Sequence, residues 1–283
     1  MNTSPTGNTF MDESELKKIN ANGIDIAYRE FGSGEPLLMI TGYSATMDMW
    51  STAFLSELSR NYRVIVFDNR GTGYSSYDDR YFTIPLFADD SKALLEALGV
   101  SEAHILGWSM GTNIALEMAI KYPEILKSLI LYAADCGGKE ALMAGPDIYE
   151  MLADTSGTDQ ERGMRLLGLL FPERWFEEHP DIMSYFPVVT ETISPEVVAM
   201  QYKAMEIWNG ADSKLHEIDN PVLIITGTED ILTPPENSVM IAEKISGSWL
   251  IRLKDSGHGA MYQYPENMAS AVKLFTDSEV SHP

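Results

Sequence analysis

The pentapeptide Gly107-Trp108-Ser109-Met110-Gly111 matches the motif G-x-S-x-G and lies between a short apolar run and a helical pattern. In that setting the central residue occupies a tight turn from a strand into a helix, and the flanking glycines leave room for neighbouring chain to pass close by. The first turn of a helix carries unpaired N–H groups that favour a developing negative charge. We therefore expect a nucleophilic serine. The alternative, a serine that only caps the helix, stays open on this motif alone.

A serine nucleophile needs a general base, and the chain has 5 histidines that could supply one. His258 is the best placed, because it lies in the glycine-flanked loop 255–259 directly after the last predicted strand. Its other interpretation is an ordinary polar loop residue. The other histidines suit the role less well, being in the tail, in the region 135–215, in the strand that leads to the pentapeptide and at the opposite end of a strand: His282, His179, His104 and His216, respectively.

Three carboxylates compete to orient this histidine. Asp230 follows a predicted strand and so belongs at the carboxyl edge of the sheet, Asp135 follows the end of another strand, and Glu229 is the third option. Each has the alternative interpretation of a solvated loop acid, the usual role in so acidic a chain. The order Ser109, Asp230, His258 agrees with the order nucleophile, acid, histidine. It favours Asp230 and leaves Asp135 open.

The segments that must position these residues alternate between short apolar runs and helical patterns. The first two runs flank Asn22-Gly23, a strong hairpin-turn dipeptide. The alternation predicts an α/β fold, in which helices cover both faces of a mostly parallel sheet. The predicted strands are 16–19, 24–31, 36–40, 63–67, 103–106, 126–132, 221–226 and 249–253, and the predicted helices are 84–98, 109–120, 238–245 and 266–275.

The alternation stops after Ala134 and resumes near residue 216. Residues 135–215 are rich in methionine and aromatic residues, are interrupted by prolines and contain no apolar run of the strand type. We expect them to form a helical insertion. The chain is thus predicted to consist of a core formed by residues 1–134 and 216–283 and a helical cap formed by residues 135–215.

The composition excludes several classes of protein and of partner. With 283 residues, 45% hydrophobic and 22% charged, the chain has the composition of an ordinary globular protein. It carries 42 acidic against 20 basic residues, a net charge of −22. So acidic a surface repels phosphate backbones and anionic lipid, so that binding to nucleic acid or to a membrane is disfavoured.

Cofactor and compartment are constrained by what the chain contains. Its single cysteine, Cys136, cannot form an internal disulfide, and His258 has no second histidine at metal-ligand spacing. We expect no metal and no cofactor. The first fifteen residues carry no signal-peptide pattern and no apolar run approaches the length of a membrane span, so we expect a cytoplasmic protein, a monomer or homodimer.

Taken together, the motifs resemble those of an α/β-hydrolase with a helical cap, over residues 16–276. Within that superfamily the chain is similar to the 3-oxoadipate enol-lactonase, proline iminopeptidase and cofactor-free haloperoxidase groups. The resemblance implies an eight-stranded, mostly parallel sheet flanked by helices, with the cap inserted after the sixth strand. It is carried by the pentapeptide, by the run 68–75, by Gly227-Thr228-Glu229-Asp230 with Pro234-Pro235, and by Gly257-His258 followed by Pro265-Glu266.

The resemblance also implies an oxyanion hole. One donor would be the backbone N–H of Met110 and the other the backbone N–H of Tyr43, in the loop after the third strand. Thr41 stands in this loop where the family usually has histidine. Because the donor is a main-chain group, this departure need not abolish catalysis, but it leaves open how the loop is braced.

Apolar residues near the pentapeptide and in the cap predict a covered apolar pocket, although core packing is the alternative interpretation of each one. Such a pocket suits a small to medium acyl ester or lactone as the substrate. The residues that we expect to line it are Trp108, Trp175, Tyr185, Phe186 and Trp208.

Other reactions are less well supported. Ser109 argues against the dehalogenases and epoxide hydrolases of this fold, which use a carboxylate nucleophile. Cys136 lacks an activating turn, and the run 71–76 lacks the third glycine of a dinucleotide loop. Two rivals to an esterase or lactonase remain. One is an aminopeptidase of the proline iminopeptidase type, and the other is a non-catalytic ligand receptor on the same fold. In the first, acidic cap residues would hold a free amine: Glu177, Glu178 or Glu206.

Overall fold

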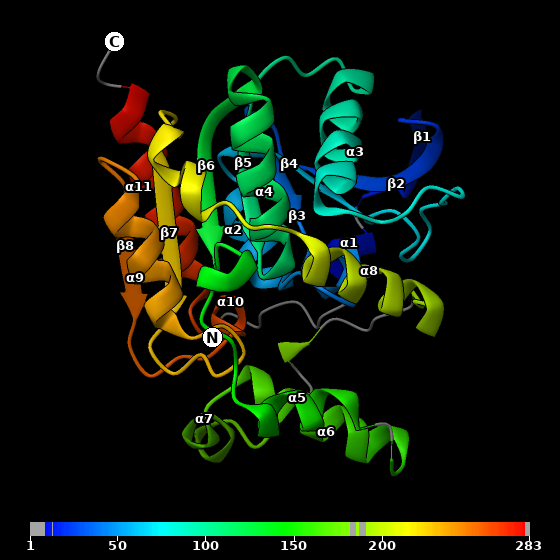
Figure 1. The fold of residues 1–283 in the computed structure, drawn as a ribbon, viewed down its shortest axis with the longest axis vertical. Helices are drawn as coiled ribbons and strands as arrows, with labels where there is room; N and C mark the ends of the chain where they lie inside the picture. The colour runs from blue at the N-terminus through cyan, green and yellow to red at the C-terminus, as the bar shows by residue number, and fades with distance from the viewer. Residues whose placement is uncertain (1–8, 13, 155, 182–184, 187–190, 281–283) are drawn as a thin grey trace.

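The computed structural model of the chain describes residues 9–12, 14–154, 156–181, 185–186 and 191–280. These residues form one eight-stranded sheet with the strand order β1-β2-β4-β3-β5-β6-β7-β8 (Figure 1). β2 pairs antiparallel with β1 and β4, and the remaining pairs are parallel. The strands are β1 (Lys17–Ala21), β2 (Ile24–Phe31), β3 (Glu35–Ile40), β4 (Tyr62–Phe67), β5 (Ala103–Trp108), β6 (Leu126–Tyr132), β7 (Val222–Gly227) and β8 (Trp249–Leu253).

Helices pack on both faces of the sheet, as predicted. One face carries α3 (Ile84–Ala97), α4 (Met110–Lys121) and α9 (Pro235–Lys244), whose buried side chains belong to one core cluster. The other face carries α2 (Thr52–Ser59) and α11 (Pro265–Val280), which belong to a second cluster. The sequence analysis did not predict α2, and α11 is longer than the predicted helix 266–275. Two short helices complete the core: α1 (Thr9–Asp12) and α10 (Ala260–Gln263).

The apolar runs of the central strands follow from this two-sided packing. In β3, Leu38 and Ile40 point into the first cluster, while Leu37 and Met39 point into the second. Successive side chains of a strand face opposite sides, so a strand covered on both faces must be apolar throughout. All six residues of β5 and of β7 are buried for the same reason.

The predicted hairpin turn joins β1 to β2. Asn22 has φ 48° and Gly23 has φ 78°, and Ala21 pairs with Ile24. Positive φ at both central residues defines a turn of type I′, whose twist matches that of the flanking strands. The hairpin turn predicted from the Asn-Gly dipeptide is therefore present, and the structure adds its type.

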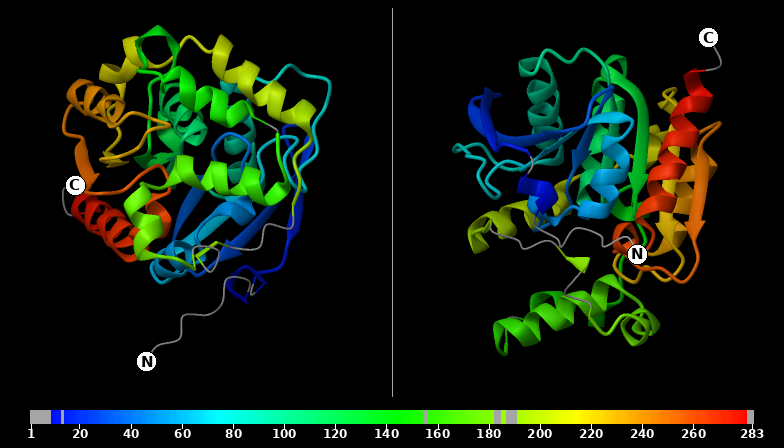
Figure 2. Two further views of the ribbon diagram at one scale, coloured as in Figure 1. Left: turned by 90° about the horizontal axis from the view of Figure 1, so that it is seen from below. Right: turned by 180° about the vertical axis from the view of Figure 1, so that it is seen from behind.

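Between β6 and β7 the described residues form helices and loops and no strand. Figures 1 and 2 place α5, α6 and α7 beyond the ends toward which β6 and β7 point. α8 instead contributes to the first core cluster, next to α3 and α4. The boundaries of the predicted cap, at residues 135 and 215, stay a prediction. The α-helices that the described residues form within them are α5 (Pro146–Ala153), α6 (Asp159–Leu170), α7 (Glu173–Glu178) and α8 (Pro195–Ile207).

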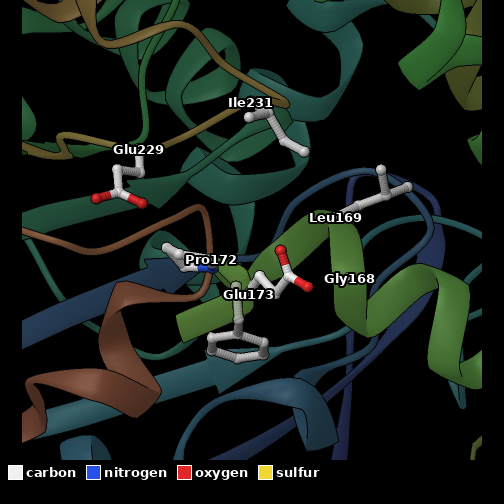
Figure 3. A pocket seen from close by; sticks show the side chains of 7 residues that line it. Gly168, Leu169, Pro172, Glu173, Glu229 and Ile231 are labelled. Atoms are coloured by element: carbon white, nitrogen blue, oxygen red, sulfur yellow. The ribbon is translucent and has the colours of Figure 1, made fainter. Parts of the chain in front are cut away.

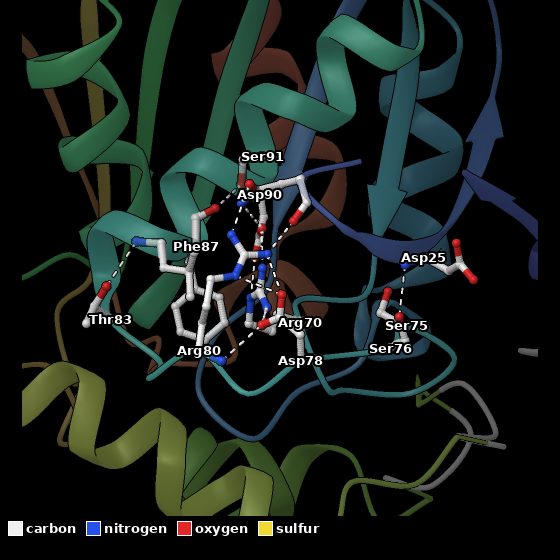
Figure 4. A network of polar contacts seen from close by, with 12 residues as sticks. Asp25, Arg70, Ser75, Ser76, Asp78, Arg80, Thr83, Phe87, Asp90 and Ser91 are labelled. Carbon is white, nitrogen blue, oxygen red and sulfur yellow. Dashed lines mark hydrogen bonds and ion pairs between the residues drawn. The ribbon is translucent and has the colours of Figure 1, made fainter. Parts of the chain in front are cut away.

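A buried arginine fixes the turn that follows β4. Arg70 has no exposed side-chain surface and makes two hydrogen bonds to the carboxylate of Asp90 in α3, at 2.8 and 2.7 Å. Its third contact is with Asp78, at 2.8 Å (Figure 4). Asn22 also donates to Asp90, at 2.6 Å, so the network joins the turn, α3 and the β1–β2 hairpin. A buried ion pair with this many hydrogen bonds is costly to break on one side.

We expect Arg70→Met to lower the free energy of unfolding by about 3–5 kcal/mol, because it leaves the Asp90 carboxylate buried without its partner. The matched control is Arg80→Met. Arg80 also pairs with Asp78, but its side chain is 41% exposed, so its loss should cost less than about 1 kcal/mol. Urea unfolding at neutral pH measures both, and equal losses in the two variants would contradict the prediction.

Candidate active site

Ser109 occupies a strained turn between β5 and α4. Its backbone has φ 56° and ψ −123°, a conformation that costs a non-glycine residue on the order of 1–3 kcal/mol. The flanking glycines permit it: a Cβ atom at Gly107 would lie 2.3 Å from the carbonyl oxygen of Gly111, and one at Gly111 would lie 2.2 Å from the carbonyl oxygen of Ile40. The turn is therefore as tight as the pentapeptide predicted.

His258 and Asp230 meet at the carboxyl edge of the sheet. His258 Nδ1 lies 2.9 Å from Asp230 Oδ2, and both residues are buried, at 4% and 3% exposure. The other Asp230 oxygen accepts hydrogen bonds from the backbone N–H groups of Leu232 and Thr233, at 3.0 and 2.8 Å. Asp230 Oδ2 is thus left to accept from the Nδ1–H group, and a neutral His258 then carries its lone pair on Nε2.

The loop that carries His258 is anchored by Tyr132 at the end of β6. The Tyr132 hydroxyl donates to the carbonyl oxygen of His258, at 2.5 Å, and accepts from the backbone N–H of Met261, at 3.1 Å. Trp108 packs against both residues, with its ring centroid 5.7 Å from that of His258 and 6.2 Å from that of Tyr132. In the sequence, Tyr132 is the last residue of an apolar run, so no role in the site was predicted for it. The signal that could have indicated one is a hydroxyl group at the carboxyl end of a buried strand.

The loop after β3 lies against the turn that carries Ser109. A Cβ atom at Gly42 would lie 3.0 Å from Ser109 Cβ, so the backbone that leads to Tyr43 passes directly beside the serine. Part of its bracing comes from the end of β4: Asn69 donates to the Thr41 hydroxyl at 3.1 Å, and Asp68 accepts from the N–H of Met47 at 2.9 Å. Thr41 is therefore held by an amide side chain.

The three predicted acids occupy different surroundings. Asp230 contacts the imidazole, whereas Asp135 accepts from the N–H of Gly137 at 2.7 Å and from Asn113 Nδ2 at 3.1 Å. Burial raises the pKa of Asp135. Glu229 is exposed. The carboxylate that accepts from His258 is thus that of Asp230, which the chain order favoured.

The glycines on either side of His258 allow the end of α6 to pack directly against the histidine loop. A Cβ atom at Gly257 would lie 2.5 Å from the carbonyl oxygen of Leu170, and one at Gly259 would lie 2.5 Å from the ring of Phe171. The backbone N–H of Gly259 donates to Leu170 O at 2.9 Å. The end of α6 therefore rests directly on the histidine loop, and a side chain at either glycine would push it away.

Two hollows lie between this part of the cap and the loops after β7 and β8. The larger, of about 450 Å³, is lined from the cap side by α6 and the start of α7 and from the core side by Glu229 and Ile231 (Figure 3). The smaller, of about 170 Å³, includes Trp175, Arg174 and Asp255. Both border the loop that carries Asp230, since Glu229 lines each of them.

The predicted pocket residues fall into two groups. Trp175 lines the smaller hollow and stacks on Phe171, with ring centroids 4.3 Å apart, while Tyr185 meets Trp175 edge to face, with centroids 5.3 Å apart. The rings of Phe186 and Tyr262, in the same aromatic group, have centroids 4.6 Å apart. The other two are buried and line neither hollow: Trp108 in the second core cluster and Trp208 in the first.

In the described part of the chain, neither a reactive cysteine nor a metal site is an alternative to the site around Ser109. Cys136 is buried, and its burial together with the nearby Asp135 and Asp212 raises the pKa of the thiol to about 11. A thiol with so high a pKa is a poor nucleophile near neutral pH. Among the described residues no cluster of three or more His, Cys, Asp or Glu side chains could hold a metal ion. No helix within those residues is long and apolar enough to cross a bilayer.

Two buried carboxyl groups face each other where the segment before α8 meets the end of β4: those of Glu191 and Asp68. Glu191 is 7% exposed, and in the described residues no N–H group donates to either of its carboxyl oxygens. A Cβ atom at Gly73 would lie 2.2 Å from Glu191 Oε2 and 2.3 Å from Asp68 Oδ2, so the two carboxyl groups face each other. Burial and the charge of Asp68 raise the pKa of Glu191 to about 9; Asp48 adds to this effect and Arg29 opposes it. Burial also raises the pKa of Asp68. The pair therefore holds a proton at neutral pH.

Glu191 should make the protein less stable at alkaline pH. The pKa of Glu191 is about 9 in the folded protein against 4.5 for the free group. The contribution of its protonation to the free energy of unfolding is therefore complete below pH 4.5 and is lost as the pH rises toward 9. We expect the urea midpoint of the wild type to fall between pH 5 and pH 9, and that of Glu191→Gln to fall less. The exposed Glu196, replaced by Gln, is the control and should follow the wild type. Parallel profiles for wild type and Glu191→Gln would contradict the prediction.

The fold and this edge of the sheet define the class of protein. Residues 35–265 match the model of the alpha/beta hydrolase fold family, and the chain belongs to that family. The predicted superfamily and fold class are thereby confirmed.

Similar proteins carry several activities in their names. The chain is 26% identical over 259 residues to BpoC of Mycobacterium tuberculosis, named as a non-heme bromoperoxidase, and the match covers 89% of this chain and 97% of BpoC. It is 26% identical to the 2-hydroxymuconate semialdehyde hydrolase of a Pseudomonas species, over 92% of this chain and 93% of that enzyme. The structure of a thermophilic esterase from Thermogutta terrifontis superposes with a TM-score of 0.79 at 26% identity, covering 94% of this chain and 99% of the esterase.

Proposed function

We propose that this protein is a serine hydrolase that cleaves a carboxylic ester or lactone through an acyl-enzyme. The observation that carries the proposal is the buried contact of 2.9 Å between His258 and Asp230, at the edge of the sheet where the strained Ser109 lies. Ser109 follows β5, Asp230 follows β7 and His258 follows β8. These strands are parallel, so their carboxyl ends come together at one edge.

Each residue has a defined role in the proposed reaction. Ser109 Oγ attacks the substrate carbonyl as its proton passes to Nε2 of His258, and Asp230 stabilises the imidazolium that forms. The backbone N–H groups of Met110 and Tyr43 stabilise the oxyanion, each contributing roughly 3 kcal/mol in the transition state. The imidazolium returns its proton to the leaving alkoxide. His258 then takes a proton from water as the water attacks the acyl-enzyme, and it passes that proton to Ser109 Oγ as the bond to the acyl group breaks and the acid is released.

The surroundings of the site favour a neutral acyl substrate. Aromatic side chains gather where the cap meets the histidine loop, among them Phe171, Phe186 and Tyr262. Of the described residues that line the hollows, the one arginine is Arg174, which already pairs with Glu178 and Asp255. An anionic substrate would have to compete with those carboxylates. The esterase and hydrolase names of similar proteins support the same class of substrate.

Ser109→Ala should abolish both hydrolysis of p-nitrophenyl esters and covalent labelling by a fluorophosphonate probe, because both need the serine oxygen as nucleophile. The control is Ser91→Ala, a buried serine whose hydroxyl donates to Phe87 O within α3; its labelling should match that of the wild type. Persistent labelling of Ser109→Ala would place the nucleophile elsewhere.

Asp230→Asn should lower kcat for ester hydrolysis by roughly 10³–10⁴-fold, since the amide cannot hold His258 in the required tautomer. Asp135→Asn is the matched comparison. Asp135 lies at the end of a neighbouring strand but bonds Gly137 and Asn113, so its substitution should cost less than about tenfold. The reverse order of the two effects would assign the orienting acid to Asp135.

Turnover by the wild-type protein, measured on esters of varied acyl length, lactones and a proline arylamide, distinguishes the proposed function from its alternatives. Turnover of esters or lactones supports the proposed function. Preference for the proline arylamide would favour an aminopeptidase. Slow single turnover that ends in a stable ligand complex would favour a receptor.

A further inference from the structure

A side chain of the cap holds the loop that carries the proposed oxyanion donor. Gln201 lies in α8 and has no exposed surface. Its Oε1 atom accepts the backbone N–H of Ser44 at 2.9 Å, across 157 residues of sequence. Because a backbone N–H can only donate, this contact fixes the orientation of the Gln201 amide: the oxygen faces Ser44 and the NH₂ group faces elsewhere.

The NH₂ group of Gln201 is buried without a partner. Among the described residues no acceptor lies within hydrogen-bond distance of Nε2. A buried donor that is left unsatisfied costs about 1–3 kcal/mol, so proteins rarely keep one without a use. An acceptor atom of a bound ligand would satisfy it.

A short series of contacts connects Gln201 to the proposed nucleophile, Ser109. Ser44 has φ 53°, an unusual value for serine, and follows Tyr43 directly. Tyr43 in turn meets Tyr202, the next residue of α8, with ring centroids 6.4 Å apart. Gly42 then borders Ser109, since a Cβ at residue 42 would lie 3.0 Å from Ser109 Cβ. Two successive residues of α8 thus contact the same loop that borders Ser109.

We propose that Gln201 is a positioning and specificity-determining residue. Through Ser44 it sets the direction of the Tyr43 N–H, and with its free NH₂ group it donates to a second acceptor oxygen of the acyl substrate. The proposal rests on the proposed hydrolase function and answers how a loop with Thr41 in place of histidine is braced. The preferred substrates are acyl compounds that carry an ether or carbonyl oxygen a few atoms from the scissile carbonyl.

The two roles have different kinetic signatures. The oxyanion exists only in the transition state and the intermediate, so a misdirected Tyr43 N–H lowers kcat and leaves KM almost unchanged. A lost hydrogen bond to the second oxygen instead lowers kcat/KM selectively for substrates that carry that oxygen. p-Nitrophenyl butyrate and p-nitrophenyl methoxyacetate are a suitable pair, because their acyl chains have the same length and differ by one ether oxygen.

The experiment compares wild type, Gln201→Met and Gln201→Glu on these two esters, with Ser109→Ala as the blank. Gln201→Met keeps the volume and removes both polar groups, so we expect kcat for the butyrate to fall at least tenfold with less than a threefold change in KM. Its preference for the methoxyacetate over the butyrate should fall at least threefold relative to the wild type. Lys203→Met, on the exposed side of α8, is the control and should keep both values.

Gln201→Glu adds a pH readout that a merely structural role would not produce. When protonated, the carboxyl group keeps an acceptor for the Ser44 N–H and stays neutral; when ionised, it places a negative charge beside the oxyanion. The ratio of its kcat to that of the wild type should therefore approach 1 near pH 6 and fall at least tenfold by pH 9.

Three results would overturn the proposal. Wild-type kcat in Gln201→Met, or a pH-independent ratio in Gln201→Glu, contradicts the positioning role. An unchanged ester preference contradicts the second hydrogen bond. Should Gln201→Met fail to fold, as its melting temperature would show, the isosteric Gln201→Glu decides. Inactivity of the wild type toward every ester would instead overturn the proposed function, and this proposal with it.

Discussion

The close approach of backbone at Gly107 and Gly111 is the constraint on which the rest of the site depends. No Cβ atom fits at either position, because the carbonyl oxygens of Gly111 and Ile40 already occupy the space. This packing brings the end of β5 against the end of β3 and fixes Ser109 at a positive φ. The loop after β3 then passes within contact of the serine. The other site residues are placed by the parallel order of the remaining strands.

Buried carboxyl groups at this edge of the sheet differ in the hydrogen bonds that their oxygens accept. Asp230 accepts from two backbone N–H groups and from the Nδ1–H group of His258. Glu191 faces the carboxyl group of Asp68 and accepts from no N–H group in the described part of the chain, so the pair keeps a proton. The net charge of −22 therefore overstates the charge of the folded protein at neutral pH.

Much of the fold was predictable because its signals are local. The strands were visible as apolar runs, since burial on both faces demands apolar side chains throughout. Asn22-Gly23 identified its own turn. α2 was missed because a helix of eight residues shows few turns of periodicity, although Ser51 caps it.

The contacts that complete the candidate site were harder to predict, because burial of a polar side chain is decided by tertiary packing. Tyr132 and Gln201 each use a polar group to hold a loop that is distant in sequence. In the sequence, Tyr132 is an aromatic residue in an apolar run and Gln201 is a polar residue in a helical pattern, so neither pattern indicates a contact with a distant loop. Trp208, expected in the pocket, packs in the core, where its indole donates to Glu117 at 3.1 Å. The motifs predicted the candidate reacting groups, and the three-dimensional arrangement shows which residues hold their loops.

The glycines beside His258 carry a consequence for how this chain can vary. They are required by the cap, because the carbonyl oxygen of Leu170 and the ring of Phe171 occupy the places of their missing side chains. A larger residue at 257 or 259 would become tolerable only after the end of α6 had moved. Substitutions in the histidine loop and in residues 170–172 are therefore coupled, and a cap exchanged from another protein would have to bring its own matching loop.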